Sequence, residues 1–236
     1  MGKRSGRLKQ FNRGNTGGWS SASPSLVASA RLLLSAALQD RAQQFSNLRT
    51  HSTTHAPGAI ALIVVAFEVW LNELLLDLLL PPAETRKLLN QDTATKYSYL
   101  FGVFKPSQPP RFSNDLTVAL DVRNEIVHHF PRPADTPDSK PAWYPNLQRC
   151  GLFVTTGNPS EDFNLSQKLT SYSLAYWVFE VIDHAVADLV EGSLNPKARI
   201  QVGSTAENFK RYRSLEGPDG LTRFDAQHGI SVTRAI

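Results

Sequence analysis

Residues 58–80 read GAIALIVVAFEVWLNELLLDLLL, a run long enough for a membrane-spanning helix. Four polar residues interrupt this run: Glu68, Asn72, Glu73 and Asp77. Each centrally placed charge opposes membrane insertion by about 2.5–3.5 kcal/mol, so membrane insertion is disfavoured. Pro57 begins the run and Pro81 stops it. We therefore predict a helix over about 57–80 at the centre of a soluble bundle that has no membrane partner.

Apolar residues recur at three- and four-residue steps on both sides of this stretch, which is the period of an amphipathic helix. The pattern predicts further helices over about 24–49, 83–101, 112–130 and 166–191. Residues 151–156 have β propensity and are candidates for one short strand. Strands and helices do not alternate along the chain, so the expected fold is all-α, a bundle of about five helices.

Composition divides the 236 residues into a folded body and two basic ends. With 41% hydrophobic and 19% charged residues, the chain can bury a core. Gly, Ser, Arg and Lys dominate the first 23 residues, which we interpret as a flexible basic arm. Helices occupy 24–192, with a proline-rich insertion at 131–165, and 193–236 form a C-terminal tail without a recognisable motif.

Charge is unevenly distributed although the net charge is only +4. Residues 1–14 hold five bases and no acid, residues 193–236 hold seven bases and four acids, and residues 15–192 carry a net −4. Basic ends favour contact with a polyanion such as RNA or a membrane surface. The alternative is that the N-terminal arm is only a solvated terminus.

Most enzyme classes leave no signature here. There is no G-x-S-x-G, no glycine-rich phosphate loop and no H-E-x-x-H motif. His51 and His55 are four residues apart but have no third ligand nearby, so we expect no metal and no cofactor. The lone Cys150 excludes an intrachain disulfide, and no apolar stretch follows the basic N-terminus as a secretory signal requires. We expect a cytoplasmic protein.

Arg123 is the most unusual residue of the predicted helices. At about 100° per residue it falls in the middle of an apolar face, within about 60° of six apolar residues: Leu116, Ala119, Leu120, Ile126, Val127 and Phe130. A buried guanidinium is unfavourable unless it is paired. Asn124 and His128 lie together on one flank of this face, and His129 lies on the other.

Glu68 poses the same question, because it lies between apolar residues of the central run. Asn72 is one turn further on the same stripe, whereas Glu73 and Asp77 share another face that we expect to be solvated. We predict that Glu68 or Asn72 contacts Arg123 or lies beside it. Two interpretations remain open: a structural ion pair that fixes helix packing, or an anion site in which Arg123 holds a phosphate and a histidine moves protons.

The string Arg123-Asn-Glu-Ile-Val-His128 resembles the R-x(4–6)-H motif of the HEPN superfamily, in which R-N-x-x-x-H near a helix end is the frequent form. The segment Ala66-Phe-Glu-Val-Trp-Leu-Asn72 is similar to the first core helices of that family. The resemblance covers about residues 24–192, and the short motif is its only specific part.

This resemblance implies a helical bundle that dimerises and cleaves RNA without a metal. Arg123 would hold the scissile phosphate, Asn124 would help to position the reacting groups, and His128 would be the general acid/base for attack by the 2′-hydroxyl. His129 also satisfies the allowed spacing. The expected product is a 2′,3′-cyclic phosphate, in a toxin-like, defence or RNA-processing role, with an antitoxin or regulatory partner possible. The alternative is a noncatalytic HEPN-like binding or scaffolding module.

Overall fold

The all-α prediction is confirmed for the part of the chain that the structure describes. The computed structural model describes residues 21–44, 53–78, 80–104, 113–128, 141–152, 165–192, 206–210 and 213. Within these ranges there are eight labelled helices and no strand, and 206–210 add a short helical segment. The helices are α2 (Ser23–Gln44), α3 (Ala56–Asp77), α4 (Pro82–Leu89), α5 (Thr93–Phe104), α6 (Ser113–Val127), α7 (Tyr144–Arg149), α8 (Leu165–Leu169) and α9 (Tyr172–Gly192).

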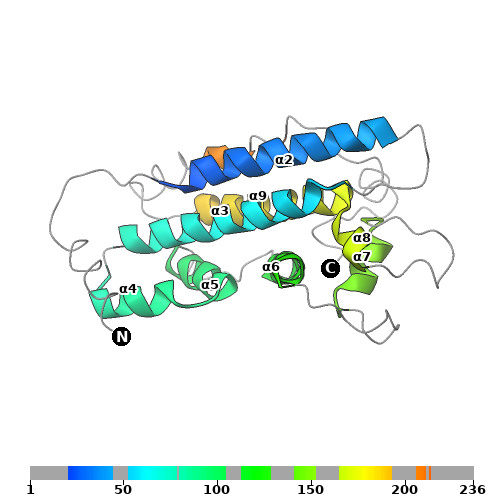
Figure 1. Cartoon of the computed structure of the whole chain (residues 1–236). Coiled ribbons are helices and arrows are strands. Elements are labelled where there is room, and N and C mark those ends of the chain that lie inside the picture. The colour runs from blue at the N-terminus through cyan, green and yellow to red at the C-terminus, as the bar shows by residue number, and fades with distance from the viewer. Residues whose placement is uncertain are drawn as a thin grey trace, which may run out of the picture.

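The helix that decides the fold, α3, is the centre of the bundle. It packs on α2, α4, α5, α6 and α9. Figure 1 shows α2 on one side of α3 and α9, and α4, α5 and α6 on the other side. In that view α6 is seen end-on, so it runs across the direction of α3. The candidate site on α6 is therefore held against the central helix of the bundle.

The apolar character of α3 also meets the length and composition of a membrane span, and no other helix in the described ranges does so. The core helix of a soluble bundle has the same composition. Eleven of its residues are buried against other helices: Ala56, Ala59, Ile60, Ile63, Val64, Ala66, Phe67, Trp70, Leu71, Leu74 and Leu75. These residues are buried by packing on five neighbouring helices.

Two helices expected to be continuous are each divided in two. The stretch predicted over 83–101 forms α4 and α5, because Asp92 caps the start of α5. Its Oδ1 accepts the Thr95 backbone N–H at 2.8 Å and its Oδ2 accepts the Thr95 hydroxyl at 2.7 Å. The stretch predicted over 166–191 forms α8 and α9, and Ser171 between them donates its hydroxyl to the Leu152 carbonyl.

The proline-rich insertion contains α7, a helix that periodicity did not predict. Gly151 follows it with a φ of 70°, the left-handed conformation that glycine adopts without strain. The Leu152 N–H bonds the Leu147 carbonyl at 3.2 Å and the Gly151 N–H bonds the Gln148 carbonyl at 3.0 Å. Gly151 and Leu152 thus close a helix rather than begin a strand, and the rest of the predicted strand lies outside the described residues.

Part of the C-terminal tail belongs to the core. Phe209 is buried, and its ring centroid lies 5.7 Å from that of Trp70 on α3. Arg213 forms an ion pair with Asp183, a buried carboxylate of α9. Phe209 is therefore attached to α3 by packing, and Arg213 is attached to α9 by charge.

Glu73 connects the end of α3 to the start of α2, which corrects the expectation that it is merely solvated. Its carboxylate accepts the Ser21 hydroxyl at 2.8 Å, the Ala22 backbone N–H at 3.2 Å and the Ser23 hydroxyl at 3.1 Å. Backbone N–H groups at the start of a helix have no partner within the helix. A negative charge near that end is also stabilised by the positive end of the helix dipole. Asp77, one turn further, is exposed as expected.

Glu73→Ala is expected to lower the free energy of unfolding by about 1–3 kcal/mol, because three hydrogen bonds at the start of α2 lose a charged acceptor. Urea unfolding at neutral pH measures this loss. Lys87→Ala, at an exposed position of α4, is the control and should change stability by no more than about 0.5 kcal/mol. Equal effects of the two substitutions would show that the cap contributes nothing.

Candidate functional site

Arg123 lies on the last full turn of α6, at the edge of the face that packs on α3, α5 and α9. The buried residues of this helix are Asp115, Leu116, Ala119 and Val122. Their centre is turned about 50° away from Arg123 around the helix axis. Val127 is 49% exposed, because the end of α6 extends past the core. Arg123 is therefore half-buried at the border of the core, not in the middle of the apolar face as predicted.

The guanidinium of Arg123 has few partners. Its Nη1 donates to the side-chain oxygen of the neighbouring Asn124 at 3.0 Å. Its Nε is buried and makes no hydrogen bond. Among the described residues, no carboxylate forms an ion pair with it. An arginine half-buried in this way keeps its full charge, so the site carries a positive charge that no described acid neutralises.

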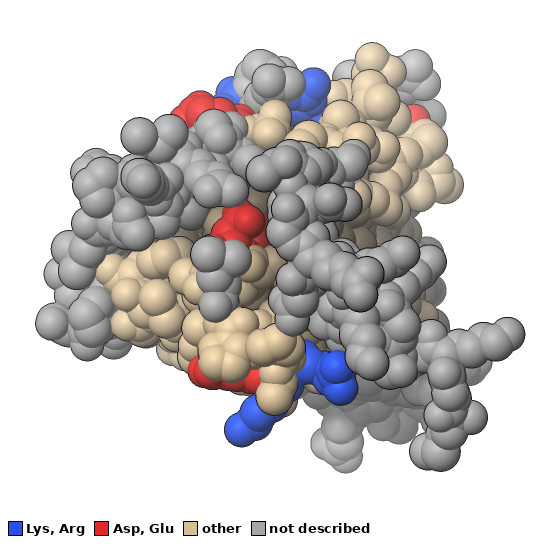
Figure 2. All heavy atoms as spheres, turned by 90° about the vertical axis from the view of Figure 1, so that its left-hand side faces the viewer, with Lys and Arg blue, Asp and Glu red and all other residues tan. Residues whose placement is uncertain are grey.

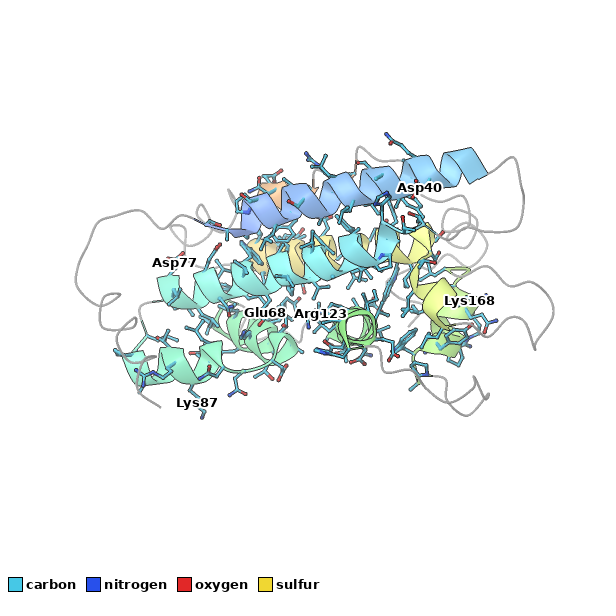
Figure 3. All side chains as sticks on the ribbon, in the orientation of Figure 1. Asp40, Glu68, Asp77, Lys87, Arg123 and Lys168 are labelled. Atoms are coloured by element: carbon cyan, nitrogen blue, oxygen red, sulfur yellow. The ribbon has the colours of Figure 1, made fainter. Side chains whose placement is uncertain are left out.

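Glu68 does not pair with Arg123, contrary to one form of the prediction. Its Oε1 accepts the Lys96 ammonium of α5 at 3.0 Å. The Lys96 side chain is 2% exposed and that of Glu68 is 34% exposed, so a buried cation is matched by a carboxylate at the surface. No hydrogen bond joins Asn72 to Arg123 either, and the Asn72 Oδ1 is buried without a hydrogen bond. Figure 3 labels Glu68 and Arg123 on the same side of α3, Glu68 at α5 and Arg123 at α6.

Asn124 and His128 occupy the solvent-facing end of α6. Both are exposed, and the His128 backbone N–H bonds the Asn124 carbonyl at 2.8 Å, which continues the helical pattern one residue past Val127. This bond keeps the His128 backbone at a fixed position relative to the turn that carries Arg123. No described side chain bonds the imidazole of His128. His129 lies outside the described residues.

Metal ligation finds no support in the described ranges, where no group of three His, Cys, Asp or Glu side chains converges. His55 lies 3.8 Å from an Asp40 carboxylate oxygen that also accepts the Thr53 hydroxyl at 2.9 Å. This pair connects α2 to the residues just before α3, where a structural role suffices. His51, the other histidine of the spaced pair, lies outside the described residues.

Sequence reasoning missed two buried charged residues on the helices around α3: Lys96 on α5 and Asp115 on α6. Nothing in the sequence around Lys96 distinguishes it from a surface lysine. Its burial is compatible with a charged side chain because Glu68 neutralises it. From its sequence position in the first turn of α6, Asp115 is expected to be a charged acid that interacts favourably with the helix dipole. Instead it is 3% exposed, and burial raises its pKa to about 7. The sequence held one signal for the burial of Asp115, which lies two turns before the apolar Val122 on the same stripe of the helix.

The end of α6 thus offers a cation without a described counter-charge, an amide and an imidazole within two turns. A cation and a titratable group at one surface can bind a phosphate and transfer protons to or from its ester oxygens. Comparisons of this chain with models of protein families, with curated proteins and with solved structures found no match.

Proposed function

We propose that this chain is a metal-independent endoribonuclease of the HEPN type, acting as a homodimer. The observation that carries the proposal is the guanidinium of Arg123, which is half-buried and lacks a carboxylate partner among the described residues. If Arg123 only fixed helix packing, an internal acid would be expected to neutralise it. The acid that the sequence suggested, Glu68, is bound to Lys96 instead. An anionic ligand is the partner that this arrangement lacks.

In the proposed reaction Arg123 binds the scissile phosphate and stabilises the charge that develops on its oxygens. His128 removes the proton from the 2′-hydroxyl of RNA, and the 2′-oxygen attacks phosphorus. The bond to the 5′-oxygen breaks, and that oxygen takes up a proton. The products are a 2′,3′-cyclic phosphate and a 5′-hydroxyl. Asn124, hydrogen-bonded to Arg123, helps to hold the guanidinium in place.

Dimerisation would complete the site. One exposed imidazole cannot serve both as the base for the nucleophile and as the acid for the leaving group within a single step. A two-fold axis near the end of α6 would place a second His128 opposite the first. The exposure of Asn124 and His128 leaves room for a second copy.

RNA would be guided by the basic ends of the sequence, which carry five and seven bases. The described residues at one end of the bundle form no basic surface that could bind RNA in place of these ends (Figure 2). In Figure 2, the described acidic and basic side chains of that end form separate small groups rather than one basic surface. Binding should accordingly weaken as salt rises. A cytoplasmic role in defence, toxicity or RNA processing, with an antitoxin or regulatory partner, belongs to the proposal on the strength of the resemblance alone.

The second candidate is a noncatalytic HEPN-like binding module. It is favoured by one observation: no described side chain orients the imidazole of His128. A catalytic histidine is usually oriented by a second group. The two candidates share the anion site at Arg123 and differ in whether the bound RNA is cut.

Cleavage in the presence of EDTA distinguishes them. Purified wild type, His128→Ala and His129→Ala are incubated with mixed RNA in chelator, and fragment ends are mapped. We expect cyclic-phosphate ends from wild type, and loss of cleavage in folded His128→Ala. His129→Ala is the matched control, and loss of cleavage in that variant alone would move the catalytic role to His129. RNA binding without cleavage by a folded wild-type dimer would overturn the ribonuclease proposal in favour of the binding module.

A further inference from the structure

Three charged side chains come from three helices that pack on one another: Glu68 from α3, Lys96 from α5 and Arg123 from α6. This junction contains two cations and one carboxylate. The carboxylate pairs with Lys96 at 3.0 Å, and the described residues provide no acid for Arg123. Figure 3 labels Glu68 and Arg123 on the same side of α3, Glu68 at α5 and Arg123 at α6. Of the two cations, Lys96 has the Glu68 carboxylate as its partner, and Arg123 has no described carboxylate.

Burial explains why Lys96 holds the carboxylate. The Lys96 side chain is 2% exposed, and an ammonium removed from water is strongly unfavourable without an opposite charge. Arg123 is only half-buried, so water can solvate part of its guanidinium. The Glu68 side chain is 34% exposed, and its carboxylate is directed towards the Lys96 ammonium. Pairing Glu68 with Lys96 is thus the lower-energy choice in the absence of ligand.

We propose that Lys96 is a positioning residue for the Arg123 site, because it holds the Glu68 carboxylate that would otherwise pair with Arg123 and block anion binding. The change of partner within the junction depends only on these three side chains. The consequence for RNA rests on the function proposed above. Lys96 touches no substrate in this scheme and acts entirely through Glu68.

Removing the lysine should redirect the carboxylate. Lys96→Met replaces a buried ammonium with an apolar side chain of similar length, so the core between α3 and α5 stays filled. Among the described residues of the three helices, Arg123 is then the cation to which Glu68 can turn, and α3 and α6 already pack together. Arg123 would gain the structural ion pair that it lacks in the wild type.

Thermal unfolding tests this redirection without any RNA. In the wild-type background Arg123→Met should leave the melting temperature unchanged or slightly raised. In the Lys96→Met background the same substitution should lower it by about 3 °C or more, because it breaks the new ion pair. Adding Glu68→Gln to the Lys96→Met background should abolish that sensitivity. Equal effects of Arg123→Met in both backgrounds would overturn the proposal. Lys96→Gln provides the same comparison should Lys96→Met fail to fold.

Binding of RNA gives a second measurement. The probe is an oligonucleotide with 2′-O-methyl groups, which cannot be cleaved by its own 2′-oxygen. We expect Lys96→Met to weaken binding about tenfold or more, and Lys96→Met with Glu68→Gln to restore wild-type affinity. Failure of Glu68→Gln to restore it would mean that Lys96 contributes by packing or by its own charge, and would overturn the positioning role.

The two measurements separate this inference from the proposed function. If wild type does not bind the oligonucleotide, the ribonuclease proposal fails, and the unfolding comparison still decides whether Lys96 controls the partner of Arg123. If wild type binds and Lys96→Met binds equally well, the inference fails and the proposed function stands.

Discussion

Arg123→Met is expected to leave a folded protein that cleaves RNA about 10²- to 10³-fold more slowly than wild type, the usual loss when one charge-stabilising group is removed from an active site. Stability should stay within about 1 kcal/mol of wild type. The substitution removes a half-buried guanidinium whose Nε has no hydrogen bond, and it leaves no described carboxylate without its partner. The rate of RNA cleavage in chelator measures the activity, and urea unfolding of the same preparation measures the stability.

Glu68→Ala is the control that shows what the loss of a structural ion pair looks like in this bundle. It leaves the Lys96 ammonium buried at 2% exposure without a counter-charge, which should cost about 3–5 kcal/mol. If Arg123→Met proves equally destabilising, Arg123 is a packing residue and the anion site does not exist. Stability close to wild type together with unimpaired cleavage would also remove Arg123 from the mechanism.

Helix positions could be predicted from the sequence wherever one apolar stripe repeats over several turns. α3 was predictable for this reason, since its residues are apolar on almost every side, Pro57 precedes the run and Pro81 follows it. The division of residues 83–101 into two helices was missed because the apolar periodicity there is weak and a side-chain cap decides where the second helix begins. Asp92, three residues before Thr95, is a capping signal that periodicity alone does not weigh.

The candidate site was predictable only in part. The position of Arg123 on an inner-facing side of its helix follows from helical geometry, but the choice of partner for Glu68 does not. Glu68 and Lys96 are 28 residues apart, and only the packing of α3 on α5 brings them together. The Glu73 cap, formed across about 50 residues, was hidden for the same reason. Charged pairs between helices carry no local pattern in sequence.

Asp115 should make the stability of the chain depend on pH in the direction opposite to that of most carboxylates. Burial raises its pKa to about 7, against an ordinary value of 3.8. Between these values the folded chain binds a proton that the unfolded chain has released. The stabilisation from the protonated form is fully present below about pH 4 and is lost as pH rises through about 7. At 1.36 kcal/mol per pKa unit, the loss approaches about 4 kcal/mol.

Asp115→Asn keeps the shape of the side chain and removes the charge, so it should be more stable than wild type at pH 8, by about 2–4 kcal/mol, and nearly equal to it at pH 4. Urea unfolding at both values measures the difference. Asp92→Asn is the opposite-sign control, because hydrogen bonds from Thr95 lower the Asp92 pKa and that variant should lose stability at neutral pH. A constant difference between wild type and Asp115→Asn from pH 4 to 8 would contradict a buried, neutral carboxyl.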